Sequence, residues 1–279
     1  MINNIYPSAR EHLKSGPKGA EQLDRYREIC RHFHPAFRFF FYESYPDVTT
    51  WMSRRLCYTR SVATTSIVGY VMGIGDRHAH NILVDEVTAE VVHIDFGIAY
   101  EQGRGLGVPE TVPFRLTRDM VDGFGLTECE GTFRKSSEEA LRVLRDSWLQ
   151  LLTIIEVVIH DPLYKWSLSP VQARNRQKSS EPDDDRAHSR DNNASKGSAN
   201  NDNGNDNNDN DPTSRFHATK SFSRDAAERT IMRMKNKLLG CEDLSGEALG
   251  VEGQVELLIN EARSPENLCR LFEGWGPWL

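Results

Sequence analysis

The stretch that decides the fold runs from Gly73 to Gly97 and reads GIGDRHAHNILVDEVTAEVVHIDFG. Two short apolar runs in it, residues 82–84 and 91–92, predict the strands of a small hairpin with Asp85–Glu90 as its turn. A polar cluster, GDRHAHN, precedes the first strand, and a second cluster, HIDFG, follows the other. Because antiparallel strands place the start of one beside the end of the next, we expect both clusters at one end of the hairpin.

The two clusters contain the groups that phosphoryl transfer requires. In kinase catalytic loops an Asp accepts the proton of the attacking hydroxyl and an Asn five positions later binds magnesium, and Asp76 and Asn81 have this spacing. Asp95, in Asp-Phe-Gly, matches the metal-binding carboxylate, and Gly97 is expected to allow a sharp turn after it. We therefore predict Asp76 as base and Asn81 and Asp95 as ligands for the magnesium, or manganese, of bound ATP.

A histidine follows the predicted base, in the order Asp-Arg-His rather than the His-Arg-Asp of ordinary protein kinases. There His78 can donate a hydrogen bond to the transferring phosphate, and we predict it as a catalytic residue; the alternative is a structural histidine. For Arg77 we favour a buried ion pair that braces the loop. His80 and His93 are expected to pack around the site. A zinc site of His78, His80 and His93 is an alternative that the spacing supports weakly.

Composition narrows the class of protein and its partners. The chain has 279 residues and a formal net charge of −7, which argues against a protein that coats nucleic acid or a membrane surface. It has no apolar run long enough to cross a bilayer. Its five cysteines are widely scattered, which is typical of a reduced intracellular compartment.

Apolar residues recur at helical spacing, so the predicted fold class is mainly α with one small β-hairpin (α+β). Ser136 and Glu139 fit a capping box for the start of a long helix. Residues 1–20 are polar and are expected to form a loose entry segment, and residues 98–118 a long functional loop. Helices are expected at 21–42 with a break near Pro35, within 47–60, and at 61–74, 117–124, 136–159, 224–239, 251–262 and after Ser264.

The C-terminal part of the chain changes composition twice. Residues 173–222 are expected to be a disordered insert, because they lack an apolar stripe and residues 200–211 contain only Asn, Asp and Gly. A regulatory helix and link are expected at 223–246. The chain then ends in LFEGWGPWL, residues 271–279, which is unusually apolar for a terminus. We expect this tail to dock on the body of the protein rather than to serve as an exposed anchor.

The motifs GIGDRH-x-x-N and HIDFG resemble the catalytic and activation loops of phosphoinositide kinases and the giant protein kinases related to them. Two features favour the protein-kinase branch. The segment between Phe96 and Arg118 has few basic residues for an inositol phosphate headgroup, and residues 252–279 resemble the FATC element that ends that branch. The resemblance implies a kinase C-lobe at 21–172, with the catalytic loop at 73–81 and the activation loop at 93–116, and a FATC-like tail at 247–279.

Three segments, SVATTSIVGYVMGIGDRHAHNIL, VHIDFGIAYEQG and PETVPFRLTRDMVDGFG, resemble most closely the branch members that act in DNA double-strand-break signalling and telomere maintenance. The resemblance implies a nuclear kinase that uses ATP and magnesium and phosphorylates Ser or Thr followed by Gln. It also implies a break-sensing complex as partner. By the same resemblance Asp76 is the base, His78 aids transfer, and Asn81 and Asp95 hold the metal.

Kinases bind ATP between two lobes, with a glycine-rich loop and a strand lysine from the N-lobe. The sequence has no candidate for either upstream of Tyr70, where Lys14 and Lys18 lie in a polar segment. We therefore expect a C-lobe that needs an N-lobe and a helical-repeat region as partners and is nearly inactive alone. A non-catalytic interaction fragment and a phosphoinositide lipid kinase are the alternatives.

Overall fold

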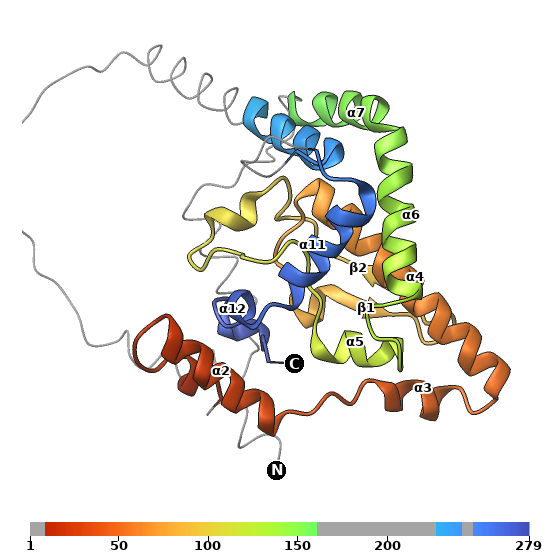
Figure 1. Cartoon of the computed structure of the whole chain (residues 1–279), viewed down its shortest axis with the longest axis vertical. Helices are drawn as coiled ribbons and strands as arrows, with labels where there is room; N and C mark the ends of the chain where they lie inside the picture. The colour runs from red at the N-terminus through yellow and green to blue at the C-terminus, as the bar shows by residue number, and fades with distance from the viewer. Residues whose placement is uncertain (1–8, 161–226, 242–247, 279) are drawn as a thin grey trace, which may run out of the picture.

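The computed structural model describes residues 9–160, 227–241 and 248–278, and these are mainly helical around a two-stranded sheet (Figure 1). This confirms the predicted fold class. Residues 9–14 and 227–239 are also helical. The bounds are α2 Ala20–His32, α3 Arg38–Ser44, α4 Val48–Met72, β1 Ile82–Val84, β2 Val91–His93, α5 Arg118–Phe124, α6 Thr132–Asp146, α7 Trp148–His160, α11 Val251–Arg263 and α12 Pro265–Leu268, with short 3₁₀ helices at Ala79–Asn81, Gln102–Gly105 and Glu273–Trp275.

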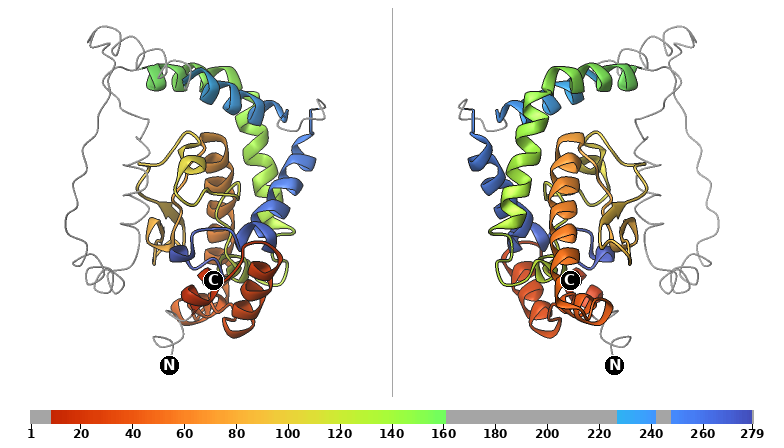
Figure 2. Two further views of the ribbon diagram at one scale, coloured as in Figure 1. Left: turned by 90° about the vertical axis from the view of Figure 1, so that its left-hand side faces the viewer. Right: turned by 90° about the vertical axis from the view of Figure 1, so that its right-hand side faces the viewer.

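Helix α4 is the centre of the packing and leads directly into the first polar cluster (Figure 2). It is one helix of 25 residues, so the prediction of two helices that meet near residue 60 is wrong; the sequence between Val48 and Gly69 has no Gly or Pro to break it. The Asp47 carboxylate accepts from the Thr50 N–H at 2.8 Å at its start. Gly73 ends it with a φ of 59°, in the left-handed region that favours glycine.

The hairpin forms where the sequence predicts it. Strands β1 and β2 pair antiparallel with Ile82 opposite His93 and Val84 opposite Val91. In the turn, the Asp85 carboxylate accepts from the N–H groups of residues 87 and 88 at 2.8 and 2.7 Å, which is an Asx turn. The Val91 N–H donates to the Ser61 hydroxyl at 2.9 Å and so attaches the hairpin to α4.

Two helices, α6 and α7, follow α5 in the chain, and only α6 packs on α4. Helix α6 lies along α4 and starts at Thr132, after Gly131 with a φ of 74°, so the capping box at Ser136 is wrong. The chain changes direction at Ser147, because α6 packs on α4 whereas α7 runs beside the helix of residues 227–239 (Figures 1 and 2).

The C-terminal tail docks on the body of the protein, as expected. Trp275 and Trp278 are buried in a cluster with apolar residues of α2 and of residues 9–14. Leu13 is one of these, so residues 9–14 are a packed helical turn and differ from the loose segment expected for residues 1–20. The predicted insert at 173–222 lies outside the described residues.

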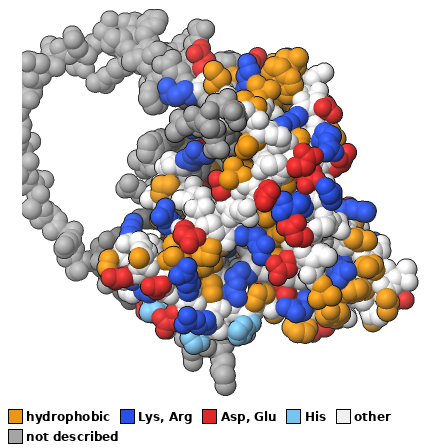
Figure 3. Space-filling model, viewed as in Figure 1, with side chains coloured by type: hydrophobic (Ala, Val, Ile, Leu, Met, Phe, Trp, Pro, Cys, Tyr) orange, Lys and Arg blue, Asp and Glu red, His pale blue; other side chains and the backbone are white. Residues whose placement is uncertain are grey.

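Three further features concern the length of the helices, the cysteines and the exposed apolar side chains. Among the described helices none is both long and apolar enough to span a bilayer. All five cysteines are free thiols. Hydrophobic side chains gather over α3 and the start of α4, at the lower right of Figure 3, where Phe39, Tyr42, Val48 and Met52 are exposed.

Candidate active site

The catalytic loop holds Asp76 and Asn81 together. Asn81 is buried, and its amide Nδ2 donates to the main-chain carbonyl of Asp76 at 2.9 Å. Asp76 has a φ of 55°, a left-handed conformation that is strained for a residue with a side chain. The carbonyl of Asn81 accepts from the Ile94 N–H at 3.0 Å, which continues the hairpin and places Asp95 one residue beyond it. The two clusters therefore lie at one end of the hairpin, as predicted.

Arg77 fastens the two clusters to each other. Its buried guanidinium donates to the carbonyls of Gly75 and Ile94, both at 2.8 Å, and to the carbonyl of Asp95. Burial lowers the pKa of this guanidinium, and the carboxylates of Asp76, Asp95 and Glu110 oppose the change. Arg77 thus braces the loop, as expected, but does so through backbone carbonyls rather than through the single ion pair that we favoured.

Asp95 is exposed at the mouth of this arrangement. Its φ is 52°, and its carboxylate oxygen Oδ1 accepts from the Gly97 N–H at 2.9 Å. The sequence suggested that Gly97 makes the turn in Asp-Phe-Gly, whereas the left-handed residue is Asp95 itself. Asp95 is thus exposed to solvent immediately after the hairpin, next to the catalytic loop.

His78 is held as a neutral imidazole. Its Nδ1 accepts from the His80 N–H at 3.2 Å, which leaves the proton on Nε2 as a free donor. Burial lowers its pKa to about 4, and the neighbouring His80 and Arg77 contribute in the same direction. Burial, with Arg77 nearby, also lowers the pKa of His93 to about 4. A neutral imidazole with an available N–H is suited to donate to an anionic oxygen.

The donors in this region fit magnesium better than zinc. Asn81 uses its amide nitrogen on the Asp76 carbonyl, so its amide oxygen is left for a metal, and Asp95 supplies an exposed carboxylate. Magnesium is commonly held by one or two such oxygens together with phosphates of the substrate. In the part of the chain that the structure describes, no group of three or more His, Cys, Asp and Glu side chains is placed to hold a metal. The zinc alternative therefore has no support.

Sequence reasoning missed Glu110, which lies in the activation loop and contacts the predicted base. Its Oε1 accepts from the Asp76 N–H at 2.5 Å. Burial raises the pKa of this carboxyl to about 7, with the Asp76 and Glu101 carboxylates adding to the rise and the Asp76 N–H and Arg77 opposing it. No local pattern in the sequence distinguishes Glu110 from a surface acid, because the contact spans 34 residues.

A buried ion pair joins the activation loop to the helix of residues 227–239. Lys237 donates to the Glu101 carboxylate and, at 2.6 Å, to the carbonyl of Tyr70, and both charged side chains are less than a tenth exposed. Burial pushes the pKa of Glu101 upward, but Lys237 and then Arg104 bring it below its ordinary value. The Glu101 N–H also donates to the Gly73 carbonyl at 3.0 Å, so this pair lies next to the start of the catalytic loop.

The backbone of the C-terminal tail accepts hydrogen bonds from Arg115, in the activation loop, and from Arg118, at the start of α5. Arg115 donates to the carbonyls of Trp275 and Gly276, both at 3.2 Å, and Arg118 donates to that of Trp278 at 3.0 Å. Two of the few arginines between Phe96 and Arg118, Arg115 and Arg118 itself, therefore already donate to backbone carbonyls of the protein.

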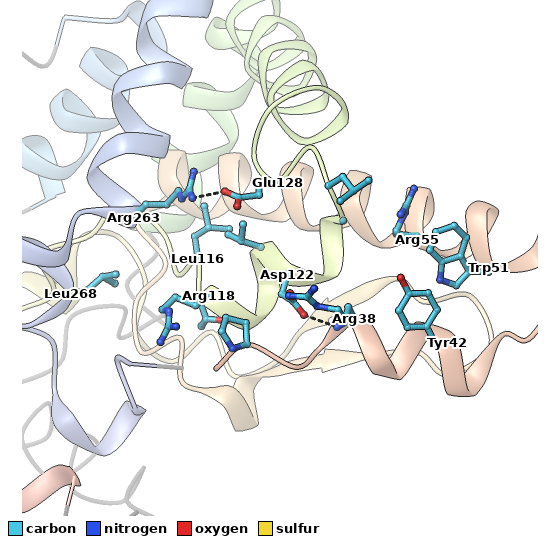
Figure 4. A pocket seen from close by; sticks show the side chains of 15 residues that line it. Arg38, Tyr42, Trp51, Arg55, Leu116, Arg118, Asp122, Glu128, Arg263 and Leu268 are labelled. Atoms are coloured by element: carbon cyan, nitrogen blue, oxygen red, sulfur yellow. Dashed lines mark hydrogen bonds and ion pairs between the residues drawn. The ribbon is translucent and has the colours of Figure 1, made fainter. Parts of the chain in front are cut away.

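A cavity of about 590 Å³ lies elsewhere, between α3, α4, α5 and the FATC-like helices (Figure 4). Two ion pairs cross its wall, Arg38 with Asp122 and Arg263 with Glu128, the latter at 2.8 Å. None of the predicted catalytic residues lines it. The cavity is therefore separate from the cluster that could perform phosphoryl transfer.

A catalytic loop and an Asp-Phe-Gly cluster, joined through a hairpin and fastened by an arginine, are the arrangement of a kinase phosphate-transfer site. The chain belongs to the phosphatidylinositol 3- and 4-kinase family, whose model matches residues 3–168, and residues 248–279 match the FATC domain. The resemblance to the FATC-bearing kinases is confirmed.

The curated relatives are large protein kinases. Serine-protein kinase ATM of Sus scrofa is 45% identical over 262 residues, which are 93% of this chain and 8% of that protein. Serine/threonine-protein kinase ATM of Arabidopsis thaliana is 44% identical over 274 residues, 98% of this chain and 6% of that protein. Serine/threonine-protein kinase tel1 of Aspergillus oryzae is 40% identical over 258 residues, 92% of this chain and 8% of that protein. The chain thus spans less than a tenth of these relatives.

Solved structures agree with this assignment. The FAT and kinase domain of CtTel1 superposes with a TM-score of 0.76 at 37% identity, and the match covers 98% of this chain and 16% of that one. The open conformation of CtTel1 gives the same TM-score and identity, with 8% of its chain covered.

Proposed function

We propose that the chain provides the catalytic C-lobe of a serine/threonine protein kinase. The observation that carries the proposal is that Arg77 fastens the loop bearing Asp76, His78 and Asn81 to the cluster that contains Asp95. When bound, magnesium (or manganese) neutralises charge on the phosphates of ATP, and Asn81 and Asp95 would hold it.

The chain's own residues then have the following roles. Asp76 accepts the proton of the substrate hydroxyl as the hydroxyl oxygen bonds to the γ-phosphorus of ATP. At the same time the bond between the γ-phosphorus and the oxygen shared with the β-phosphate breaks, and ADP leaves. His78 donates from Nε2 to the transferring phosphate and stabilises its charge. Arg77 holds the catalytic loop and the Asp95 cluster at a fixed separation. Less entropy is then lost when the reacting groups are brought together, which favours the reaction.

We further propose that the substrates are proteins with Ser or Thr followed by Gln, in nuclear DNA double-strand-break signalling and telomere maintenance, with a break-sensing complex as partner. The names of the relatives, ATM and tel1, support this. Internal use of the activation-segment arginines also favours a protein over a phosphoinositide. Arg104 pairs with Glu101 at 2.7 Å, and Arg115 and Arg118 donate to backbone carbonyls.

The test is a kinase assay on the full-length enzyme that contains this chain. Asp95→Ala should reduce phosphate transfer to a Ser-Gln peptide by a factor of 100 or more, whereas Asp24→Ala, on the exposed face of α2, should have no effect. A Ser-Ala peptide and phosphatidylinositol vesicles should be poor substrates. Retained transfer by Asp95→Ala would refute the assignment, and preferred use of the vesicles would favour the lipid-kinase alternative.

A second assay tests the need for another lobe. The 279-residue chain, purified alone, should be nearly inactive with magnesium and ATP, because these residues offer no glycine-rich loop or strand lysine to hold the nucleotide. Sustained turnover by the chain alone would contradict this part of the proposal.

A further inference from the structure

Glu110 is a buried carboxyl group that the proposed chemistry does not use, although it contacts the base of that chemistry. Its Oε1 accepts from the main-chain N–H of Asp76 at 2.5 Å. Its own N–H donates to the carbonyl of Gly103 at 3.2 Å, so the residue belongs to a closed turn of the activation loop. The side chain therefore reaches from the activation loop across to the catalytic loop.

The backbone on both sides is shaped to admit this carboxyl group. A Cβ atom at Gly75 would lie 2.7 and 2.8 Å from the two carboxylate oxygens of Glu110, closer than carbon and oxygen can approach, and a Cβ at Gly103 would also collide with them. A side chain at either position would therefore displace the Glu110 carboxyl group from its present place. One of these glycines directly precedes Asp76, so the space for Glu110 is made by the catalytic loop itself.

Asp76 is held by its backbone from two directions. Glu110 binds its N–H, and the Asn81 amide binds its carbonyl at 2.9 Å. Asp76 also has a φ of 55°, in a region where a side-chain-bearing residue persists only when its surroundings hold it. The direction of the Asp76 carboxylate therefore depends on both hydrogen bonds.

We propose that Glu110 is a positioning residue for Asp76: by accepting the Asp76 N–H, it orients the base toward the substrate hydroxyl only when the activation loop is seated. The inference rests on the proposed kinase function. On this inference the activation loop, which would hold the substrate, also sets the orientation of Asp76. A misplacement of about 1 Å in such a group can cost about 100-fold in rate.

The charge around Glu110 offers a second readout. Asp76, Arg77 and Glu101 are the charged groups that act on it, and Glu101 in turn pairs with Lys237 and Arg104. Glu110 titrates near neutral pH, with a pKa of about 7 that burial sets. The variant Glu110→Gln keeps an oxygen acceptor at the same place and removes the titration.

The experiment measures kcat and KM for a Ser-Gln peptide, and KM for ATP, in the full-length kinase. Glu110→Ala should lower kcat about 100-fold with KM for ATP unchanged, and Glu110→Gln should stay within a few-fold of wild type. Gly103→Ala should resemble Glu110→Ala, because it displaces the carboxyl group without altering either partner. Glu86→Ala, an exposed acid in the hairpin turn, is the matched control and should leave kcat unchanged.

The Ala and Gln variants of Glu110 distinguish a positioning role from a merely structural one. Rescue by Gln, together with loss of a titration step near pH 7 from the kcat profile, supports positioning by a hydrogen-bond acceptor. A kcat for Glu110→Ala within threefold of wild type overturns the inference. A Gln variant as impaired as the Ala variant also overturns it. So does an equal rise of both KM values, which indicates loss of the folded loop. Asp76→Asn with wild-type turnover would instead overturn the proposed function.

Discussion

Removing the charge of Lys237 should destabilise the chain strongly, because that residue neutralises a buried carboxylate. The side chains of Lys237 and Glu101 are 4% and 7% exposed, and Lys237 also donates to the Tyr70 carbonyl at 2.6 Å. Removing one partner of a buried pair costs about 3–5 kcal/mol. Arg104 also pairs with Glu101, at 2.7 Å, so we expect Lys237→Met to cost about 3 kcal/mol, at the lower end of that range.

Urea unfolding of the 279-residue chain, followed by tryptophan fluorescence, measures this cost as a shift of midpoint at constant slope. The double variant Glu101→Gln with Lys237→Met should be more stable than the sum of the single changes predicts, because no charge is left buried alone. Arg142→Met, in an exposed pair with Glu139, should cost about 0–1 kcal/mol. The reasoning fails if Lys237→Met costs no more than Arg142→Met, or if the two changes at the buried pair are additive.

The sign of the pH dependence is fixed by the lowered pKa of Glu101 in the folded chain. The stabilisation by this carboxylate is present above its ordinary pKa and is lost as pH falls through its folded value. The cost of Lys237→Met should therefore shrink below about pH 4.5. A cost that stays constant down to pH 3 would contradict the electrostatic origin.

Two further predictions concern the tail and the histidine. Trp278→Ala should lower the free energy of unfolding by about 3–5 kcal/mol in the same urea assay, because Trp278 is fully buried. Leu126→Ala, at an exposed site, should have little effect. Equal urea midpoints for the two variants would contradict the docked tail. His78→Gln should lower kcat of the full-length kinase about 10²–10³-fold. The shape of the pH profile of kcat between pH 6 and 8 should not change, because a pKa of about 4 keeps His78 neutral throughout that range. Loss of a titration step between pH 6 and 8 would refute the role of His78 as a neutral donor.

The hairpin and its flanking clusters could be predicted from sequence because their determinants are local. The two short apolar runs, the turn residues between them and the spacing from Asp76 to Asn81 all lie within one short stretch. Two helix boundaries were predicted wrongly: α4 continues past residue 60, where no Gly or Pro interrupts it, and α6 starts at Thr132, directly after Gly131, rather than at Ser136.

The contacts that hold the site together were hidden from sequence for a different reason. Glu110 meets Asp76 across 34 residues, and Lys237 meets Glu101 across 136. Arg77 was expected to act through a carboxylate, but a guanidinium has five donors and here satisfies backbone carbonyls from both clusters. Such partners are set by tertiary approach, which no local spacing encodes.

The backbone contacts of the C-terminal tail have a consequence for how its sequence can vary. Arg115 and Arg118 donate to backbone carbonyls of the tail rather than to its side chains, and the Tyr26 hydroxyl likewise donates to the Pro277 carbonyl at 3.2 Å. The two residues between the buried tryptophans, Gly276 and Pro277, are buried as well, and Gly276 has a φ of 59°. An insertion or deletion of one residue would therefore move every carbonyl out of reach of its donor. The length of the tail is therefore more tightly constrained than its contacts through side chains alone would require.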